Sequence, residues 1–440
     1  MIFKFTFVFL LGCFANSSHD RRLAGGLGTS NDLSKQAFNH PLSTATKAQK
    51  RSFGVGNSFF KQAWVEFPSS TIGRDGLGPL FNAVSCSSCH NNDGRGPGFK
   101  NDKVHFSTLF RISIFDKKEH PIYGGQIQPV GTNGVTGEGK VQVSFELIKG
   151  IYPDGESYEL RKPKFNFDSL NYGTLEGDVS ASPRAAPQLV GLGLLEAILD
   201  DDILAYKPDD VSGEVNWVQD IEDASLKIGR FGWKAEQPNL KQQNAAAFVG
   251  DMGLTSELFK NQNCSKVQTE CNDAPRDSEL EVSKKVLDRV TTYTQLIAVP
   301  KARDVGSKSF KLGASLFEKA RCTSCHRPSY TTGTSHPIEA LRGQKIWPYT
   351  DLKVHDMGEA LADRRLNGEV SSSKWRTPPL WSTGLIKVVN NHTNFLHDGR
   401  ARSLEEAILW HGGEAEVSKQ IFMNFNKSER KLLVHFIKSI

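Results

Sequence analysis

The chain has 440 residues, with 54 Lys and Arg against 49 Asp and Glu and a formal net charge of +5 at pH 7. This length is too great for one ordinary domain and fits two or three. A hydrophobic fraction of 38% fits a soluble globular protein with large loops. No Lys/Arg cluster is dense enough to indicate a nucleic-acid partner. Beyond the N-terminus, no apolar stretch approaches the length of a transmembrane helix.

Residues 1–13 have the features of an export signal, with Lys4 as the charged region and Phe5–Leu11 as a short apolar region. The segment that ends at Cys13 is similar to a bacterial lipobox, in which this cysteine would become the lipidated first residue. The short apolar region leaves an ordinary cleaved signal peptide as the alternative. Both interpretations predict export, to the periplasm or the outer surface of a bacterial membrane. In the lipobox interpretation, the lipid on Cys13 would be the one link to the membrane. Residues 14–50 are polar and predict a tether and a loosely packed arm.

The same arrangement occurs at 80–90 and at 316–326: a Leu-Phe pair, four residues, and then Cys-x-x-Cys-His. This pentad is the attachment signature of c-type haem. The two thiols form thioethers with one porphyrin, and the adjacent imidazole becomes the proximal iron ligand. Each Leu-Phe pair is then expected on the first helix of a cytochrome c-like unit, against a haem face. Two haem c groups are predicted, on Cys86, Cys89 and His90 and on Cys322, Cys325 and His326.

Two other uses of these cysteines remain open. A redox-active Cys-x-x-Cys pair would be expected at the start of a βαβ unit, and neither motif has that context. A zinc site would need further Cys or His at short spacing. The repetition of the whole arrangement favours haem.

Cys264 and Cys271 lie in a short polar segment. Outside the cytoplasm, a disulfide that closes this small loop is expected. The alternative is two unrelated free thiols.

The periodicity of the chain predicts a mainly α protein with two haem domains. The first, 51–300, is enlarged by β-hairpin insertions, and the second, 301–440, follows a boundary at Pro300. Predicted strands lie at 107–114, 126–130 and 141–147. Predicted helices lie at 56–64, from the turn at 75–79 into the first motif, near 200–205 and 243–248, at 278–297, from 307 into the second motif, and after Ser428 as N-cap to the C-terminus.

The chain resembles the bacterial di-haem oxidoreductases that are described as peroxidases or thiol oxidoreductases. These are related to di-haem cytochrome c peroxidases and to the di-haem enzyme that matures methylamine dehydrogenase. The likeness covers about 22–440 and rests on 75–96, 193–198, 347–358, 375–381 and 395–415, above all on Leu-His-Asp-Gly-Arg at 396–400. The thiol-oxidoreductase description has no support here, because no cysteine remains for such chemistry.

The sixth iron ligands follow partly from this resemblance. In the peroxidase relatives, the C-terminal haem takes a second ligand, usually Met, just after the His-Asp-Gly segment. The matching position here is His411. A His/His iron has a lower reduction potential than a Met/His iron. The C-terminal haem would then lack the high potential with which it accepts electrons in the relatives. Met357 is the rival ligand, and a surface role for His411 is the other alternative.

The resemblance also implies a proton-transferring glutamate near the N-terminal haem. Glu196 is a lone acid among apolar residues, after Arg184-Ala185-Ala186-Pro187, which resembles the relatives' Arg-x-Ala-Pro segment. A buried carboxyl there would suit proton shuttling. The alternatives are a solvent-facing acid and an ion pair such as one with Arg184.

An aromatic side chain between the haems would help electron transfer, and the candidates are Trp347, Trp375, Trp381 and Trp410. His355 and His397 are expected to support the C-terminal haem. Calcium lies between the domains of some relatives, but no compact Asp/Asn loop demands it here.

The sequence thus predicts an exported di-haem peroxidase, with the N-terminal haem reactive and the C-terminal haem as relay. Its expected partners are peroxide or another oxidant and a small redox protein or quinol-linked donor. The alternatives are a non-catalytic di-haem electron carrier and an enzyme that oxidises a protein or organic substrate.

Overall fold

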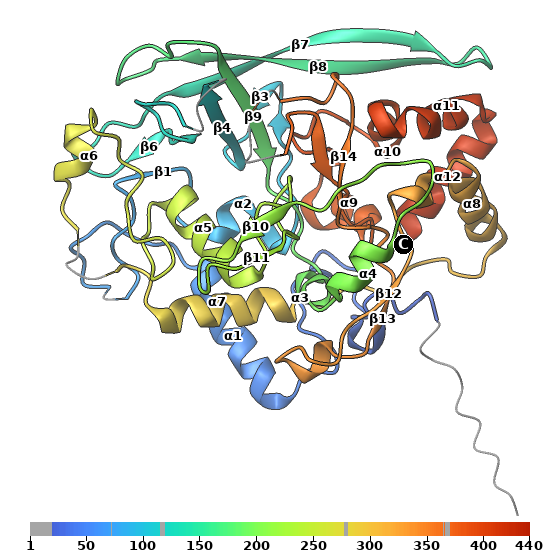
Figure 1. Ribbon diagram of the computed structural model, residues 1–440, viewed down its shortest axis with the longest axis horizontal. Coiled ribbons are helices and arrows are strands. Elements are labelled where there is room, and N and C mark those ends of the chain that lie inside the picture. The colour runs from blue at the N-terminus through green and yellow to red at the C-terminus, as the bar shows by residue number, and fades with distance from the viewer. Residues whose placement is uncertain (1–19, 72, 115–118, 277–279, 364, 366–369) are drawn as a thin grey trace, which may run out of the picture.

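The computed structural model describes residues 20–71, 73–114, 119–276, 280–363, 365 and 370–440. The predicted export signal and Cys13 lie outside these residues. Figure 1 shows short helices and small sheets packed against one another, and one large hydrophobic core joins them. Helix makes up 30% and strand 19% of the described residues. The prediction of a mainly α protein was therefore wrong, because the β insertions form far more strand than the sequence pattern indicated.

The helices are mostly short. The longer ones are capped by Ser, Thr or Asn side chains at α1, α5, α7, α8 and α12. The α-helices are α1 (Lys47–Lys61), α2 (Cys86–Cys89), α3 (Leu192–Glu196), α4 (Asp200–Ala205), α5 (Leu240–Met252), α6 (Thr269–Asp273), α7 (Lys284–Leu296), α8 (Lys308–Lys319), α9 (Ile386–Asn390), α10 (Leu404–Leu409), α11 (Glu416–Asn424) and α12 (Lys427–Ser439).

The strands form small antiparallel sheets, most of them of two strands. Their bounds are β1 (Leu80–Phe81), β2 (Phe99–Lys100), β3 (Lys103–Val104), β4 (Thr108–Ile114), β5 (Gln126–Ile127), β6 (Val130–Gly131), β7 (Lys140–Ile151), β8 (Ser157–Asp168), β9 (Val179–Ala185), β10 (Trp217–Gln219), β11 (Leu226–Ile228), β12 (Tyr330–Thr331), β13 (Lys345–Ile346), β14 (Val354–Asp356) and β15 (Lys374–Arg376). The three-stranded sheet has the order β5-β4-β9.

The β7–β8 hairpin runs along one edge of the molecule (Figure 1). Its turn reaches residues near the C-terminus. The buried guanidinium of Arg430 pairs with Asp154 at 2.9 Å and Glu156 at 2.6 Å and lies 3.8 Å from the ring centroid of Tyr152. The hairpin therefore ties the β insertion to α12.

Two pairs of helices have the same construction. Gly56 of α1 lies against α7, where an added Cβ would be 2.2 Å from the carbonyl oxygen of Arg289. Gly313 of α8 lies against α12, where an added Cβ would be 2.3 Å from the carbonyl oxygen of Leu432. Glycine at each crossing lets the helix backbones approach closely. The last helix therefore packs on α8, the helix that leads into the second motif.

The first Leu-Phe pair does not occupy the position that its sequence offset predicted. Leu80 and Phe81 form strand β1, paired with β6, and no helix leads from the turn at 75–79 into the first motif. The residue of α1 that corresponds to Phe317 of α8 is instead Phe60, whose ring lies 5.1 Å from that of Tyr293. A connection over 64–85 separates α1 from the first motif, whereas α8 leads directly into the second.

Two further predictions need correction. Residues 20–50 are not a loosely packed arm, because Phe38 and Leu42 are completely buried in the main core and Ser30 bridges to Pro300. The N-cap of α12 is Asn426, which accepts hydrogen bonds from the backbone of Ser428 and Glu429. The domain boundary at 300 stays a prediction. No helix within the described residues has the length and apolar character needed to cross a membrane.

Candidate haem sites

The first motif lies on the short helix α2, whose N-cap is Ser85. The ring Nδ1 of His90 is 2.8 Å from the carbonyl oxygen of Pro187. A carbonyl can only accept, so Nδ1 carries the proton and Nε2 keeps its lone pair. Burial lowers the pKa of His90 to about 4, despite the opposing hydrogen bond to Pro187. The side chain is therefore a neutral imidazole with Nε2 available to a metal.

The second motif repeats this arrangement at the end of α8. The ring Nδ1 of His326 is 2.9 Å from the carbonyl oxygen of Tyr349, and burial lowers the pKa of His326 to about 4. The ring of Phe317 lies 6.2 Å from that of His326, and the ring of Phe60 lies 6.3 Å from that of His90. The imidazole of each motif is thus hydrogen-bonded to a backbone carbonyl oxygen and has a phenylalanine ring beside it.

Both motifs line one cavity of about 440 Å³. Its four motif cysteines are not joined in disulfides. Burial raises the pKa of Cys86 and Cys322 to about 12, whereas a redox-active Cys-x-x-Cys pair has a lowered pKa. No group of three or more His, Cys, Asp or Glu that could hold a metal ion occurs among the described residues. The two motifs therefore fit haem attachment better than either alternative, and no cluster for calcium is found in that part of the chain.

Several buried polar atoms at the cavity wall lack a hydrogen-bond partner in the part of the chain that the structure describes. The side-chain oxygens of Gln237 and Gln243 and the Nε of Arg111 are buried without a hydrogen-bond partner among the described residues, and all three side chains line the cavity. Such atoms are costly unless a ligand or water satisfies them. Arg184 and Arg376 also line this wall and could pair with porphyrin carboxylates. The guanidinium groups therefore suit a ligand with anionic edges, as a haem c has.

The rival sixth ligands, His411 and Met357, both line the cavity. The ring Nδ1 of His411 is 2.7 Å from the carbonyl oxygen of Ala407, which leaves Nε2 free. Burial lowers the pKa of His411. Burial is the main cause of the low pKa of His326, and the charge of His411 lowers it further, which indicates that the two imidazoles are close. His411 thus has the same arrangement as His90 and His326, with Nδ1 hydrogen-bonded to a backbone carbonyl oxygen and Nε2 free.

The two histidines expected to support the C-terminal haem have different environments. His355 is 2.8 Å from Asp351 and 2.9 Å from Glu414. Burial opposes its charge, but these carboxylates outweigh burial and raise the pKa of His355 to about 12. With both ring nitrogens engaged, it cannot ligate iron. Its Nδ1 also lies 3.5 Å from the sulfur of Cys325, so it supports the second motif directly.

His397 is 5% exposed and lines the cavity. Its ring nitrogens make no hydrogen bond within the described part of the chain, and burial lowers the pKa of His397 well below its usual value. Its ring stacks on Trp375, the one tryptophan of the four candidates that lines the cavity. The other three, Trp347, Trp381 and Trp410, belong to or pack against the hydrophobic core.

Glu196 is not among the residues that line the cavity. Its Oε1 accepts a hydrogen bond from the backbone of Leu240 at 2.7 Å, and its Oε2 accepts one from the side chain of Gln295 at 2.6 Å. His336 is 3.3 Å away. The carboxylate therefore holds the start of α5 rather than facing the haem site. Its predicted ion pair with Arg184 does not form either, because Arg184 pairs with Asp363 at 3.4 Å.

Among the cavity residues that the sequence did not single out, three carry polar or aromatic groups suited to the chemistry: Trp233, Glu236 and Asp251. Asp251 follows the cavity-facing stripe of α5, with Asn244, Ala247 and Phe248 at helical spacing before it. Burial raises the pKa of Asp251 to about 6, although the hydrogen bond from Gln126 opposes this. Burial would also raise the pKa of Glu236, but Arg184 and Arg111 outweigh it and lower that pKa. Helical periodicity over 240–251 was the signal that could have found Asp251.

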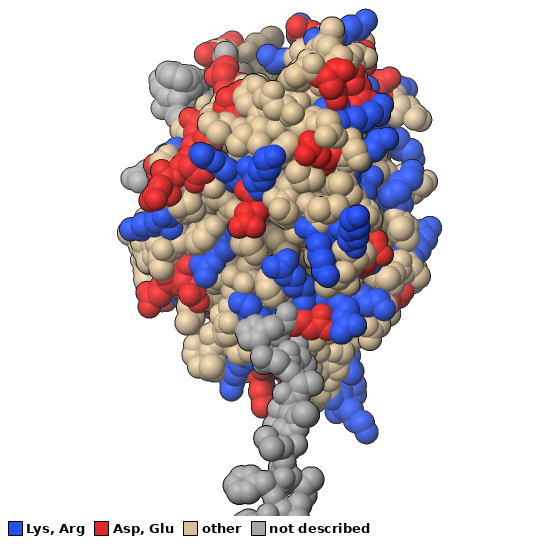
Figure 2. All heavy atoms as spheres, turned by 90° about the vertical axis from the view of Figure 1, so that its right-hand side faces the viewer, with Lys and Arg blue, Asp and Glu red and all other residues tan. Residues whose placement is uncertain are grey.

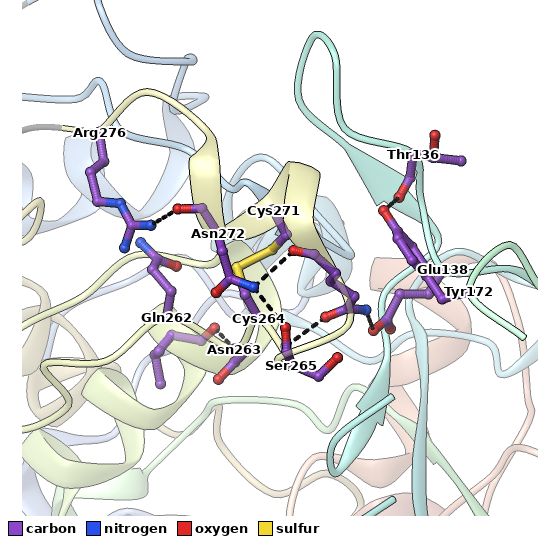
Figure 3. Close-up of a disulfide and its surroundings, with 12 residues drawn as sticks. Thr136, Glu138, Tyr172, Gln262, Asn263, Cys264, Ser265, Cys271, Asn272 and Arg276 are labelled. Carbon is purple, nitrogen blue, oxygen red and sulfur yellow. Dashed lines mark hydrogen bonds between the residues drawn. A yellow bond between two sulfur atoms is a disulfide. The ribbon is translucent and has the colours of Figure 1, made fainter. Parts of the chain in front are cut away.

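Figure 3 shows the disulfide between Cys264 and Cys271, whose Cα atoms are 5.7 Å apart. The loop that it closes supports α5. Asn263 donates a hydrogen bond to the carbonyl oxygen of Val249 at 2.7 Å, and Gln268 donates one to Glu138 at 2.6 Å. The disulfide therefore supports the end of α5 that carries Asp251.

These observations describe a protein with two c-type haem motifs that open into one cavity. The chain belongs to the family "Di-haem oxidoreductase, putative peroxidase", which it matches over 20–117 and 128–440. The predicted resemblance is confirmed. No curated protein matches the chain. A chain of the hydrazine synthase of Kuenenia stuttgartiensis is structurally similar, with 15% sequence identity, coverage of 90% of this chain and 89% of that chain, and a TM-score of 0.35.

Proposed function

We propose that the chain is an exported di-haem peroxidase in which the first motif holds the reactive haem and the second holds the electron relay. The observation that carries this is the asymmetry between the two ends of the cavity. At the second motif, His326 is accompanied by the imidazole of His411. At the first, the cavity wall near the cysteines carries the carboxyl group of Asp251. An iron with two imidazoles passes electrons, whereas an iron with an open position can bind peroxide.

Peroxide reduction consumes two electrons and two protons and yields two water molecules. A group that takes a proton from one oxygen and returns it to the other works best when its pKa lies near the operating pH. Asp251 meets this requirement, because burial brings its pKa to about 6. Glu236 meets it less well, because neighbouring cations lower its pKa. We therefore assign the proton transfer to Asp251 rather than to Glu196, whose carboxylate binds the start of α5.

Two aromatic side chains offer a route for electrons between the motifs. Trp233 donates its Nε1–H to the carbonyl oxygen of Ala185 at 3.0 Å, two residues before Pro187, which anchors His90. Trp375 faces His355 across the β14–β15 pair. Both indoles line the cavity, and Arg376 donates a backbone hydrogen bond to Trp233 at 2.9 Å. Indoles that line the cavity shared by both motifs are suited to carry electrons from the second site to the first.

The cellular setting is part of the same proposal. A disulfide persists in oxidising compartments, which supports an extracytoplasmic location, and Cys13 would supply a lipid anchor. The electron donor would be a small redox protein or a quinol-linked carrier.

The test compares the haem-loaded wild type with D251N and E196Q. Loss of a general acid–base costs about 10²–10⁴-fold in rate, so D251N should lose peroxide turnover by that factor while its haem spectrum stays unchanged. E196Q should keep turnover within a few-fold. Full turnover by D251N, or a large loss confined to E196Q, would overturn the assignment.

A further inference from the structure

The charges of the chain are unevenly divided along the sequence. Residues 301–440 carry 22 Lys and Arg against 14 Asp and Glu, whereas residues 1–300 carry 32 against 35. The segment that contains the second motif is thus basic, and the remainder is slightly acidic. Figure 2 shows the face that includes α8, α11 and α12, where Lys and Arg side chains are spread over the surface with Asp and Glu among them. Such a field attracts an anionic partner and speeds its encounter.

A surface groove lies on this face, beside the second motif. Its volume is about 400 Å³, and its wall is formed by Lys319, Glu416, Val417, Gln420, Ile421, Asn424 and Phe425. The carboxylate of Glu416 is neutralised by an ion pair with Lys419 at 2.6 Å. Val417 is 54% exposed, although it is apolar. The ammonium of Lys319 lies 5.3 Å from the ring centroid of Phe425. The groove therefore combines apolar side chains with the cation of Lys319, and its one acidic side chain is already paired.

One helix separates this groove from the haem cavity. Val417 and Ile421 of α11 face the groove, while Ser418 and Lys419 of the same helix line the cavity. At the other wall, Lys319 lines the groove and Cys322, three residues later, lines the cavity. A molecule seated in the groove would therefore lie one helix away from the second haem site.

The exposed stripe of α8 extends the cationic side of the groove. Lys308, Leu312, Ser315 and Lys319 follow at helical spacing and are exposed. Lys308, Lys311 and, on α12, exposed Lys431 form no ion pair with any residue that the structure describes. Unpaired cations around an apolar patch are typical of a surface that steers a charged partner and then releases it.

We infer that the groove between α8 and α11 is the docking site of the electron donor, and that this donor is a small redox protein with an acidic surface. The inference rests on the proposed function, because it needs the second site to receive the electrons. An acidic protein matches the charge of the face, and its apolar contact would cover Val417. Charge steering acts on the association rate and is screened within about 8–10 Å at physiological salt.

The experiment follows reduction of the haem-loaded ferric protein by reduced plant-type ferredoxin, an acidic iron–sulfur protein, in a stopped-flow instrument. The second-order rate constant should fall steeply as salt rises. K319E and K308E should each lower it about three- to tenfold at low salt. V417S removes the apolar contact without adding a charge and should lower it with less dependence on salt. K149E is the matched control, because Lys149 is exposed on β7 and the net charge changes equally; its rate should equal that of the wild type.

Equal rates for K319E and K149E, or a rate that rises with salt, would overturn the docking site. The failure of the proposed function would give a different result. Rapid-freeze spectra show which haem accepts the first electron. If the five-coordinate haem is reduced before the haem with two imidazoles, the relay assignment fails, while the comparison of K319E with K149E still decides where ferredoxin docks. Reduction by dithionite should be equal in all variants and shows that each has both haems intact.

Discussion

The indole of Trp375 and the imidazole of His397 stack face to face, with ring centroids 3.7 Å apart and planes 10° apart. Cations surround the indole, with Lys234 at 4.3 Å and Arg184 at 4.9 Å from its ring centroid. The backbone of His397 accepts a hydrogen bond from Ala185 at 2.7 Å, close to the segment that anchors His90. The stack therefore connects the surroundings of the two motifs.

Trp375→Leu removes this stack and should slow electron transfer between the haems, because no aromatic ring would then face His397. Both haems should remain attached, since neither motif changes. Trp347→Leu is the matched control, because Trp347 does not line the cavity, and it should leave the rate unchanged. Single-turnover reoxidation of the fully reduced protein by peroxide measures the rate. Equal rates in the two variants would contradict the role of Trp375.

His411→Met should raise the reduction potential of the second haem, because Met is a weaker donor than imidazole to ferric iron. Axial ligands set haem potentials over a range of about 0.8 V, so the change should be clear in a spectroelectrochemical titration. Met357→Leu should leave both potentials in place. A shift caused by Met357→Leu and not by His411→Met would identify Met357 as the ligand.

The pH dependence of peroxide turnover follows from the raised pKa of Asp251. Proton abstraction needs the ionised carboxylate, and burial raises its pKa from the ordinary value of 3.8 to about 6. As pH falls below about 6, kcat/KM should therefore decrease about tenfold per pH unit. D251N should lack this acidic limb. A wild-type profile that stays flat down to about pH 4.5 would contradict the assignment.

The glycine at the α1–α7 crossing gives a stability prediction with a control on the same helix. Gly56→Ala places a Cβ 2.2 Å from the carbonyl oxygen of Arg289 and should destabilise the protein by about 1–3 kcal/mol. Gly54→Ala meets nothing within 4 Å and should stabilise α1 by about 0.5–1 kcal/mol. Denaturant unfolding of the two variants measures both effects. A loss of stability in both would mean that the crossing is not the cause.

Local motifs could be predicted from the sequence, but the helix expected at the first Leu-Phe pair was misplaced. Leu80–Phe81 and Leu316–Phe317 precede their cysteines by the same number of residues, which predicts that the two pairs are equivalent. The structural counterpart of Phe317 is Phe60, because the connection over 64–85 lies between α1 and the first motif. The better signal is the shared pattern Ser-Phe-x-x-Gly-x-Ser-x-Phe-x-x-Ala, at 52–63 and 309–320. This pattern contains the glycine that each helix crossing requires and the phenylalanine that lies beside His90 or His326.

The candidate site divides in the same way. His90 and His326 follow from spacing alone, because attachment chemistry fixes the order of Cys and His in a few residues. The choice between Glu196 and Asp251 depends on which side of a helix faces a cavity built from distant segments. The sequence neighbours of Glu196 are apolar, but in the folded protein its carboxylate accepts a hydrogen bond from the first residue of α5. No local pattern shows that Leu240 and Gln295 surround it.

The central claim is that the two irons differ in coordination. The most direct test is an EPR spectrum of the purified, haem-loaded protein, as isolated and after partial reduction. The account predicts a high-spin ferric signal from the first site beside a low-spin signal from the site of His326 and His411. Two low-spin signals in both states would contradict it and would leave a di-haem electron carrier as the better description.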